Sequence, residues 1–471
     1  MDELPAEMLY LICRALPQIT DIKSFRLTSR KFADIGAAFL LPDVHIFLHP
    51  DALTDVERIS QHSKVSRNVT SLIFEADILH PYFTYDQWEA QIDGRDPRQF
   101  FSHFDEPDTE EGRVQREREL AEWDATPRHQ LSDEKLQAGW DAYRRTACWT
   151  NALLDSGDDI FALTRILARL PALKRIYLSC EEGLAPRSQR MHNAFIDCHL
   201  REIYSINNPK FRTGVRQLEA TLCAAKAAAT KLHKLHVGSV HWSIFQTDSL
   251  AVKYSSLCAN VTSFRLRILA GRDLDSNEPQ WEAEDCRLHL QKGTLRRFLQ
   301  SMTNLTTLEV SFVGSDGPAG APADISHIAG RTVWPQLRKL ELFGISAEQH
   351  ALVDVIERHT STLKTLYFGD MHLTTGSWIA AFQEVQVKTN LEKALLAGCL
   401  SAAPEGASDP LREEDEAKSY DIQLPEEGAD PLREAMTEYL LRGGDCPLLN
   451  YDYYLKEALP TQNNDYIPLS G

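Results

Sequence analysis

Charged and aromatic side chains recur at matching positions within a series of short apolar segments. Most lie between two apolar residues, as Glu341 lies between Leu340 and Leu342. Neighbouring side chains of a β-strand point to opposite faces, so these residues would share the face that the apolar residues do not occupy. The set comprises Tyr177, Tyr204, His236, Arg265, Arg267, Glu309, Glu341 and Tyr367.

The chemistry that these side chains offer is binding. Arginine and tyrosine dominate the energetic centres of protein interfaces, and carboxylates supply charge complementarity. The chain has no P-loop, no H-E-x-x-H zinc motif and no G-x-S-x-G nucleophile elbow, and its 16 histidines fall in no metal-ligand frame. We therefore expect a protein that binds another protein rather than an enzyme, with no catalytic residue, no metal site and no cofactor.

A strand–helix repeat positions these residues. The pattern L-x-x-L-x-L that starts at Leu337 returns 26 residues later at Leu363. Between the two copies, Leu352, Val355 and Ile356 follow one stripe of a helix. One strand and one helix cannot bury their own apolar faces, so each unit needs neighbouring copies to pack on.

Further copies of the pattern cover most of the chain at spacings of 26 to 44 residues. A degenerate last copy has Leu391 followed by Leu395. This irregular period resembles that of leucine-rich repeats. The predicted fold is α/β: a leucine-rich-repeat solenoid with parallel strands on its concave face, where the polar set would lie. Earlier copies start at Leu173, Leu200, Leu232, Val261 and Leu305.

Three short helices are predicted at the N-terminus. Pro5 suits a first helical turn. An apolar stripe from Met8 to Leu16 follows, and Pro17 ends that helix. Asp21 is placed to cap a second helix, and a third begins near Phe32.

This segment resembles an F-box, with Phe32 standing where many members have Trp. Residues 1–76 also resemble F-box-like leucine-rich-repeat proteins of filamentous fungi, and residues 145–400 resemble them more loosely. The matching residues are Leu4, Pro5, Glu7, Met8, Leu9, Ile12, Leu16, Pro17, Ile22, Phe25, Leu27, Ser29, Arg30, Phe32 and Ile35.

The resemblance implies an adaptor of a Skp-cullin-F-box ubiquitin ligase. Such a protein binds a Skp-type linker, and through it a cullin, while its repeats hold a target protein. The residues expected to meet the linker are Leu4, Pro5, Leu9, Ile12 and Leu16. The alternative is a scaffold outside any ligase, whose N-terminal helices only cap the solenoid and bury their stripe against Val44–Leu48.

Changes in composition divide the chain into six parts. Residues 1–42 form the F-box-like segment, 43–76 a linking strand–helix–strand unit and 77–146 a charged insertion with a mobile loop. The insertion is flanked by aromatic residues, which suit either a helix packed on the solenoid edge or a lid. Residues 147–400 form the repeat array, 401–434 an acidic and partly disordered tail, and 435–471 a capping helix with its tail.

Composition limits the partners and the compartment. The net charge of −18 over 471 residues disfavours nonspecific binding to nucleic acid or to an anionic membrane. The nine cysteines are scattered, which suits a reducing compartment. The sequence has neither a basic signal-peptide start nor an apolar run long enough to cross a bilayer. We expect a cytoplasmic or nuclear protein.

Overall fold

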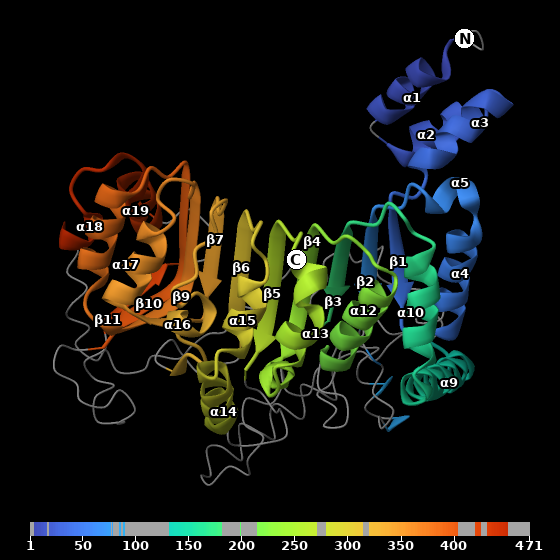
Figure 1. Cartoon of the computed structure of the whole chain (residues 1–471). Helices are drawn as coiled ribbons and strands as arrows, with labels where there is room; N and C mark the ends of the chain where they lie inside the picture. The colour runs from blue at the N-terminus through green and yellow to red at the C-terminus, as the bar shows by residue number, and fades with distance from the viewer. Residues whose placement is uncertain are drawn as a thin grey trace. The chain divides into compact units, whose positions relative to one another are not determined.

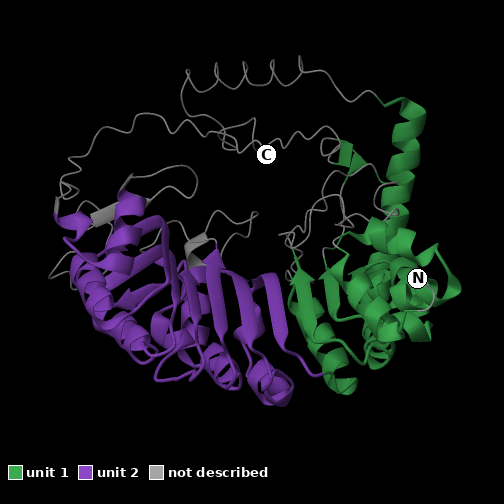
Figure 2. Ribbon diagram, turned by 90° about the horizontal axis from the view of Figure 1, so that it is seen from above, with its two compact units in different colours: residues 1–230 green, residues 231–471 purple. Residues whose placement is uncertain are grey.

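A computed structural model shows a mixed α/β chain in two compact units, residues 1–230 and 231–471 (Figures 1 and 2). No helix in the described part of the chain is both long and apolar enough to span a bilayer. The structure describes residues 4–16, 18–76, 78, 84–85, 88–89, 131–180, 198, 214–270, 279–313, 320–403, 420–424 and 431–450.

Unit 1 begins with a three-helix segment made of α1 (Ala6–Ala15), α2 (Ile19–Arg26) and α3 (Arg30–Gly36). Ser29 caps α3 by accepting the N–H of Phe32, and the Phe32 ring lies 4.5 Å from that of Phe25. A methyl group at Gly36 would come within 2.3 Å of the Arg26 side chain, so the small residue lets α3 approach α2 closely. The segment therefore has a core of its own, which comprises Leu9, Cys13, Ile22, Phe32 and Ala37.

Three parallel strands follow in unit 1, in the order β1-β2-β3. Residues that alternate along each strand, such as Leu72 and Phe74 on β2, are fully buried. The period of two seen in the sequence is thus the period of burial. The remaining elements of unit 1 are η1 (Ala37–Phe39), β1 (Asp43–Phe47), α4 (Pro50–Gln61), α5 (Ser63–Ser66), β2 (Ser71–Glu75), α9 (Asp133–Ser156), α10 (Asp158–Ala168), β3 (Arg175–Ser179) and α12 (Val215–Ala227).

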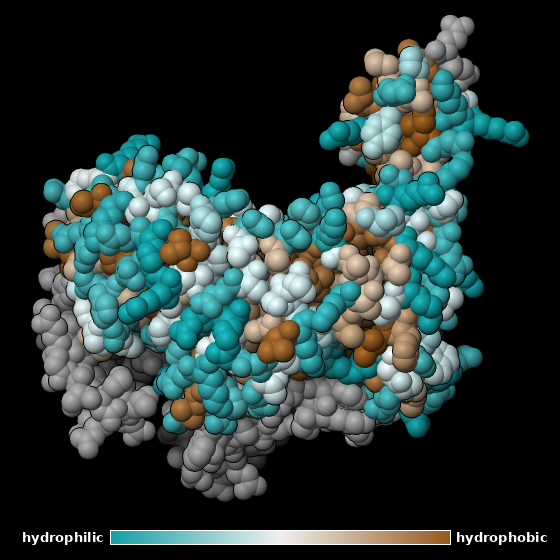
Figure 3. Space-filling model, in the orientation of Figure 1, coloured by the Kyte–Doolittle hydropathy of each residue, from teal (hydrophilic) through white to brown (hydrophobic). Residues whose placement is uncertain are grey.

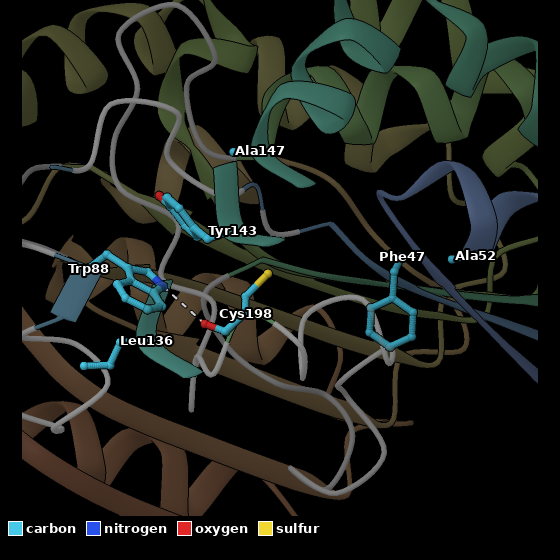
Figure 4. Packing of buried hydrophobic residues seen from close by; sticks show 7 residues of the cluster. All are labelled: Phe47, Ala52, Trp88, Leu136, Tyr143, Ala147 and Cys198. Carbon is cyan, nitrogen blue, oxygen red and sulfur yellow. Dashed lines mark hydrogen bonds between the residues drawn. The ribbon is translucent and has the colours of Figure 1, made fainter. Parts of the chain in front are cut away.

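Helix α9 carries three of the aromatic residues predicted to flank the charged insertion, namely Trp140, Tyr143 and Trp149, while Trp123 lies outside the described residues. Tyr143 is buried with Trp88 in a cluster that also holds Leu136 and Phe47, and the Trp88 Nε1–H donates to the carbonyl oxygen of Cys198 at 3.2 Å (Figure 4). Packing inside unit 1 explains Tyr143 and Trp88, whereas Trp149 on the same helix is 48% exposed. The predicted boundary at residue 146 falls within this 24-residue helix.

Unit 2 repeats strand and helix along the chain. An added helix, α14, accounts for the longest spacing between repeat copies, from Val261 to Leu305. The elements are β4 (Lys234–His241), η3 (Trp242–Phe245), α13 (Ser249–Cys258), β5 (Ser263–Leu269), α14 (Pro279–Gln291), α15 (Thr294–Gln300), β6 (Thr307–Val313), α16 (Ile325–Ile328), β7 (Lys339–Phe343), β8 (Ser346–Glu348), α17 (Gln349–Glu357), β9 (Thr365–Thr375), α18 (Trp378–Lys388), β10 (Lys393–Ala402), β11 (Tyr420–Leu424), α19 (Pro431–Arg442) and η6 (Pro447–Asn450).

The sheet of unit 2 is parallel from β4 to β10, in the order β4-β5-β6-β7-β9-β10. Strand β8 pairs with the far end of β9. Strand β11 lies antiparallel to β10, so part of the predicted acidic tail belongs to the sheet. Helices line the outer side of this curved sheet, and we call the opposite side the inner face (Figure 2).

The repeat leucines build the core between the sheet and the helices of unit 2. Phe264 on β5, for example, places its ring 5.8 Å from that of Phe298 on α15. The first leucine of each described copy precedes its strand and is also buried. The last copy corrects the predicted register, because Ala394 and Leu396 are buried there while Leu395 is 38% exposed. The copy predicted at Leu200 lies outside the described residues.

Three neighbouring strand segments of unit 2 each have a residue with positive φ at a matching position along the sheet. These residues are Gly344 after β7, Asp370 in β9 and Gly398 in β10. A Cβ atom at Gly344 would lie 2.2 Å from the carbonyl oxygen of Phe312. A Cβ atom at Gly398 would lie 2.1 Å from Asp370 Oδ1, which accepts the N–H of Cys399 at 2.7 Å. We call this line the crease. The pairing of β9 with β10 shifts register across it.

Candidate binding surfaces

Five of the predicted site residues form one row across the inner face of unit 2. His236 on β4 pairs in register with Arg265 on β5, which pairs with Glu309 on β6. The row continues to Glu341 on β7 and Tyr367 on β9. Residues that occupy matching positions of neighbouring parallel strands lie side by side on one face. The period of the strands therefore places His236 and Tyr367, which are 131 residues apart in the sequence, in one row.

Ion pairs connect the middle of this row. The Arg265 Nε lies 2.8 Å from the Glu309 carboxylate. Lys339, two residues before Glu341 on β7, places its Nζ 2.7 Å from the Glu341 carboxylate. The side chains of Glu309 and Glu341 are only 22% and 17% exposed, so both carboxyl groups have lost most of their contact with water. A partly desolvated ion pair is stronger than one on an open surface.

The Glu309 carboxyl group is held partly protonated near neutral pH. Burial raises its pKa to about 7, and a hydrogen bond with Glu341 and the negative charge of that residue act in the same direction. The positive charges of Arg265 and Lys339 oppose the rise. Two neighbouring carboxyl groups with little water between them favour sharing one proton.

His236 is neutral at every physiological pH. Burial, the largest cause, and the positive charges of Lys234, Arg265 and Lys339 together lower the pKa of its imidazole to about 3. Its Nε2 lies 3.0 Å from the Ser263 hydroxyl. Three cations thus lie close enough to act on His236, at one end of the row.

The structure places the other predicted inner-face residues as follows. Arg267 follows Arg265 by two positions on β5 and pairs with Ser311, so it lies in the next row of the same face. Tyr177 belongs to β3 of unit 1, where Ile73 and His45 share its row. Tyr204 lies outside the described residues.

A second surface is apolar and lies on α1. Met8, Leu11 and Ile12 follow at the i, i+3, i+4 spacing of one helix face, and Leu11 is 55% exposed. Ile19 at the start of α2 is also exposed. Hydrophobic side chains reach the surface in the three-helix segment (Figure 3). An exposed apolar cluster on a small helical segment is a candidate contact site for another molecule.

The predicted linker-binding residues divide between this exposed face and the interior. Leu9 is fully buried, and Leu16 is half-buried. Ile12 is 38% exposed and Pro5, the N-cap of α1, is exposed. Leu4 is half-buried, and its carbonyl oxygen accepts a hydrogen bond from Lys31 Nζ at 2.5 Å.

Leu11 was missed by the sequence prediction. The stripe from Met8 to Leu16 predicts a single apolar face, but α1 has two. Leu9 and Cys13 form a buried face, and Met8, Leu11 and Ile12 form an exposed one. A second set of apolar residues at i, i+3 and i+4 was the available signal.

Neither surface has the features of a metal centre. Among the residues that the structure describes, no group of three or more His, Cys, Asp or Glu side chains is placed to hold a metal ion. No known protein family matches the sequence, and a search of curated proteins finds no match.

Proposed function

We propose that this protein is a substrate-recognition adaptor of a Skp-cullin-F-box ubiquitin ligase. The three-helix segment α1–α3 binds a Skp-type linker, and a leucine-rich-repeat solenoid binds the protein target on its inner face. The adaptor makes and breaks no bond. It contributes by holding the target near the transferring enzyme, which raises the local concentration of the target.

The exposed apolar face of α1 carries this proposal. The segment already has a core made by Leu9, Cys13 and Phe32, so Met8, Leu11 and Ile12 are not needed to hold its helices together. Exposing such side chains to water is unfavourable by about 25 cal/mol per Å² of apolar surface. A partner that covers them removes this cost. The F-box-like residue pattern of the same segment favours a Skp-type linker as this partner.

The solenoid part of the proposal is supported by the succession of strand and helix in unit 2. Buried repeat positions and polar inner-face positions alternate there along β5, β6 and β7. A solenoid of this kind offers a continuous strand surface to a bound protein.

Co-purification with a fungal Skp-type linker tests the proposal. The full chain should capture linker at 1:1, and Leu11→Glu/Ile12→Glu should lose it, because two charges would enter an apolar interface. Glutamate keeps a good helix propensity, so the segment stays folded. Val387→Glu, at an exposed apolar position on α18, is the matched control and should capture linker normally.

Two results would contradict the proposal. A folded wild-type chain that captures no linker would favour the alternative of a scaffold outside any ligase. Undiminished capture by Leu11→Glu/Ile12→Glu would show that the linker, if bound, does not use α1. Circular dichroism of each variant establishes that α1–α3 is still helical.

A further inference from the structure

The inner face of unit 2 carries more positive than negative charge, in contrast to the acidic chain as a whole. Across β4 to β7 its charged side chains are four cations, Lys234, Arg265, Arg267 and Lys339, and two carboxyl groups, Glu309 and Glu341. The chain carries a net charge of −18. We call these six residues together with His236 the inner strip.

We propose that the inner strip binds an acidic peptide segment, rich in Asp or Glu, of the target protein. This inference deepens the proposed function, because it gives the chemical character of the target. A carboxylate of the target would lie at the end of the strip where Lys234 and Arg265 flank the neutral His236.

The spacing of the strip suits an extended peptide. Neighbouring strands lie about 4.8 Å apart, so β5, which carries Arg265, and β7, which carries Lys339, are separated by about 10 Å, and Lys339 is offset from Arg265 by two residues along the strand. Side chains on one side of an extended peptide recur about every 7 Å. A segment that crosses the strands can therefore bring separate carboxylates close to different cations, with neutral residues over Glu309 and Glu341.

The two glutamates argue against nucleic acid as the occupant. A phosphate backbone carries a charge at every nucleotide and requires several cations in succession. Glu309 and Glu341 interrupt the cations of the strip, since each pairs with one of them. A peptide can place neutral residues at those points, whereas a phosphate chain cannot.

The Glu309–Glu341 pair makes the binding depend on pH. The groups that face Glu309 are Arg265 on β5 and Lys339 and Glu341 on β7. When Glu309 keeps its proton, the strip is one charge more positive than when Glu309 is ionised. Loss of the proton as pH rises through about 7 adds a negative charge to the strip and weakens the binding of an acidic peptide.

Fluorescence anisotropy with the full-length chain tests this proposal. The probes are short labelled peptides that alternate Glu with Ser and Tyr, and matched peptides with Gln or Lys in place of Glu. The Glu peptide should bind more tightly than both, and its affinity should fall as salt is added. Lys234→Gln/Lys339→Gln should weaken it about tenfold, and Glu309→Gln should tighten it above neutral pH and remove most of the pH dependence.

A matched control removes two positive charges from the helices on the outer side of the sheet. Lys253→Gln/Lys388→Gln changes α13 and α18 and should leave peptide affinity unchanged. Equal binding of the Glu and Gln peptides, tighter binding of the Lys peptide or of a single-stranded oligonucleotide, or an equal loss in the helix-side control would each overturn the inference. Linker capture does not involve the strip, so it should survive in Lys234→Gln/Lys339→Gln. The two proposals can therefore fail separately.

Discussion

The three-helix segment and the inner face of unit 2 present opposite kinds of surface. On α1 an apolar face is exposed although the helices beneath it already have a core. On the inner face, charged side chains form ion pairs, between neighbouring strands for Arg265 and Glu309 and along one strand for Lys339 and Glu341. The apolar face can be covered by a partner without breaking any contact inside the chain. A partner on the inner face must compete with the ion pairs already present, so it is selected by charge.

The largest expected effect concerns the core that underlies the inner face. Phe264→Ala removes a fully buried ring that packs on Phe298 and leaves a cavity. We expect a loss of about 3–5 kcal/mol in the free energy of unfolding, measured by urea denaturation. Phe161→Ala on α10, where the side chain is 65% exposed, should change it by less than about 1 kcal/mol. Equal losses would mean that the unit 2 core is not packed as described.

A substitution in the smaller core of the three-helix segment should reduce the free energy of unfolding less, and its effect should be confined to that segment. Leu9→Ala in α1 should cost about 2–3 kcal/mol, at the lower end for a buried leucine, because a three-helix core closes readily around a missing side chain. Hydrogen exchange should quicken in α1–α3 while the amides of β5 and β6 keep their protection. Faster exchange throughout unit 2 would show that the two regions unfold together.

Replacing the protonated carboxyl group tests the electrostatics of the inner face. The Glu309 pKa rises from 4.5 to about 7 on folding. Its favourable contribution is complete below pH 4.5 and is lost as pH rises to about 7. Glu309→Gln should therefore gain about 1–2 kcal/mol over wild type above neutral pH, after allowance for solvent screening. The gain should shrink toward pH 4.5. Urea midpoints across this range measure it, and a constant difference would contradict the shared proton.

The smallest effect is expected on the exposed face of α1. Leu11→Gln replaces one good helix former with another at a position with little packing. The free energy of unfolding of the isolated chain should change by less than about 0.5 kcal/mol. Thermal unfolding of wild type and variant compares them directly. A loss above 1 kcal/mol would place Leu11 in the core and remove the contrast between the two surfaces.

Sequence periodicity predicted the row from His236 to Tyr367 on the inner face, because the direction of side chains along a strand is set locally. A period of two fixed which side chains of β5, β6 and β7 face the helices, and the order of the repeats made those strands neighbours. The prediction failed where leucine was a poor guide to burial. In β10 the small Ala394 takes the buried position, and in α1 a second apolar face shares the helix with the first.

Other features required coordinates because they depend on pairs of atoms. The hydrogen bond between Glu309 and Glu341 is set by the register of β6 against β7. The crease depends on Asp370, a residue other than glycine with a φ of 46°, which carries no sequence signal of its own.

The crease has a consequence for how this sequence can change over generations. The Asp370 carboxylate lies where a side chain at position 398 would begin, and it also accepts the N–H of Cys399. A larger residue at 398 is excluded while Asp370 is present. A change at 370 to a residue without a side-chain oxygen leaves that N–H without its acceptor. The φ of 67° at Gly398 disfavours a side chain there as well, so position 398 is expected to stay glycine and position 370 to keep Asp or Asn in any descendants of this chain.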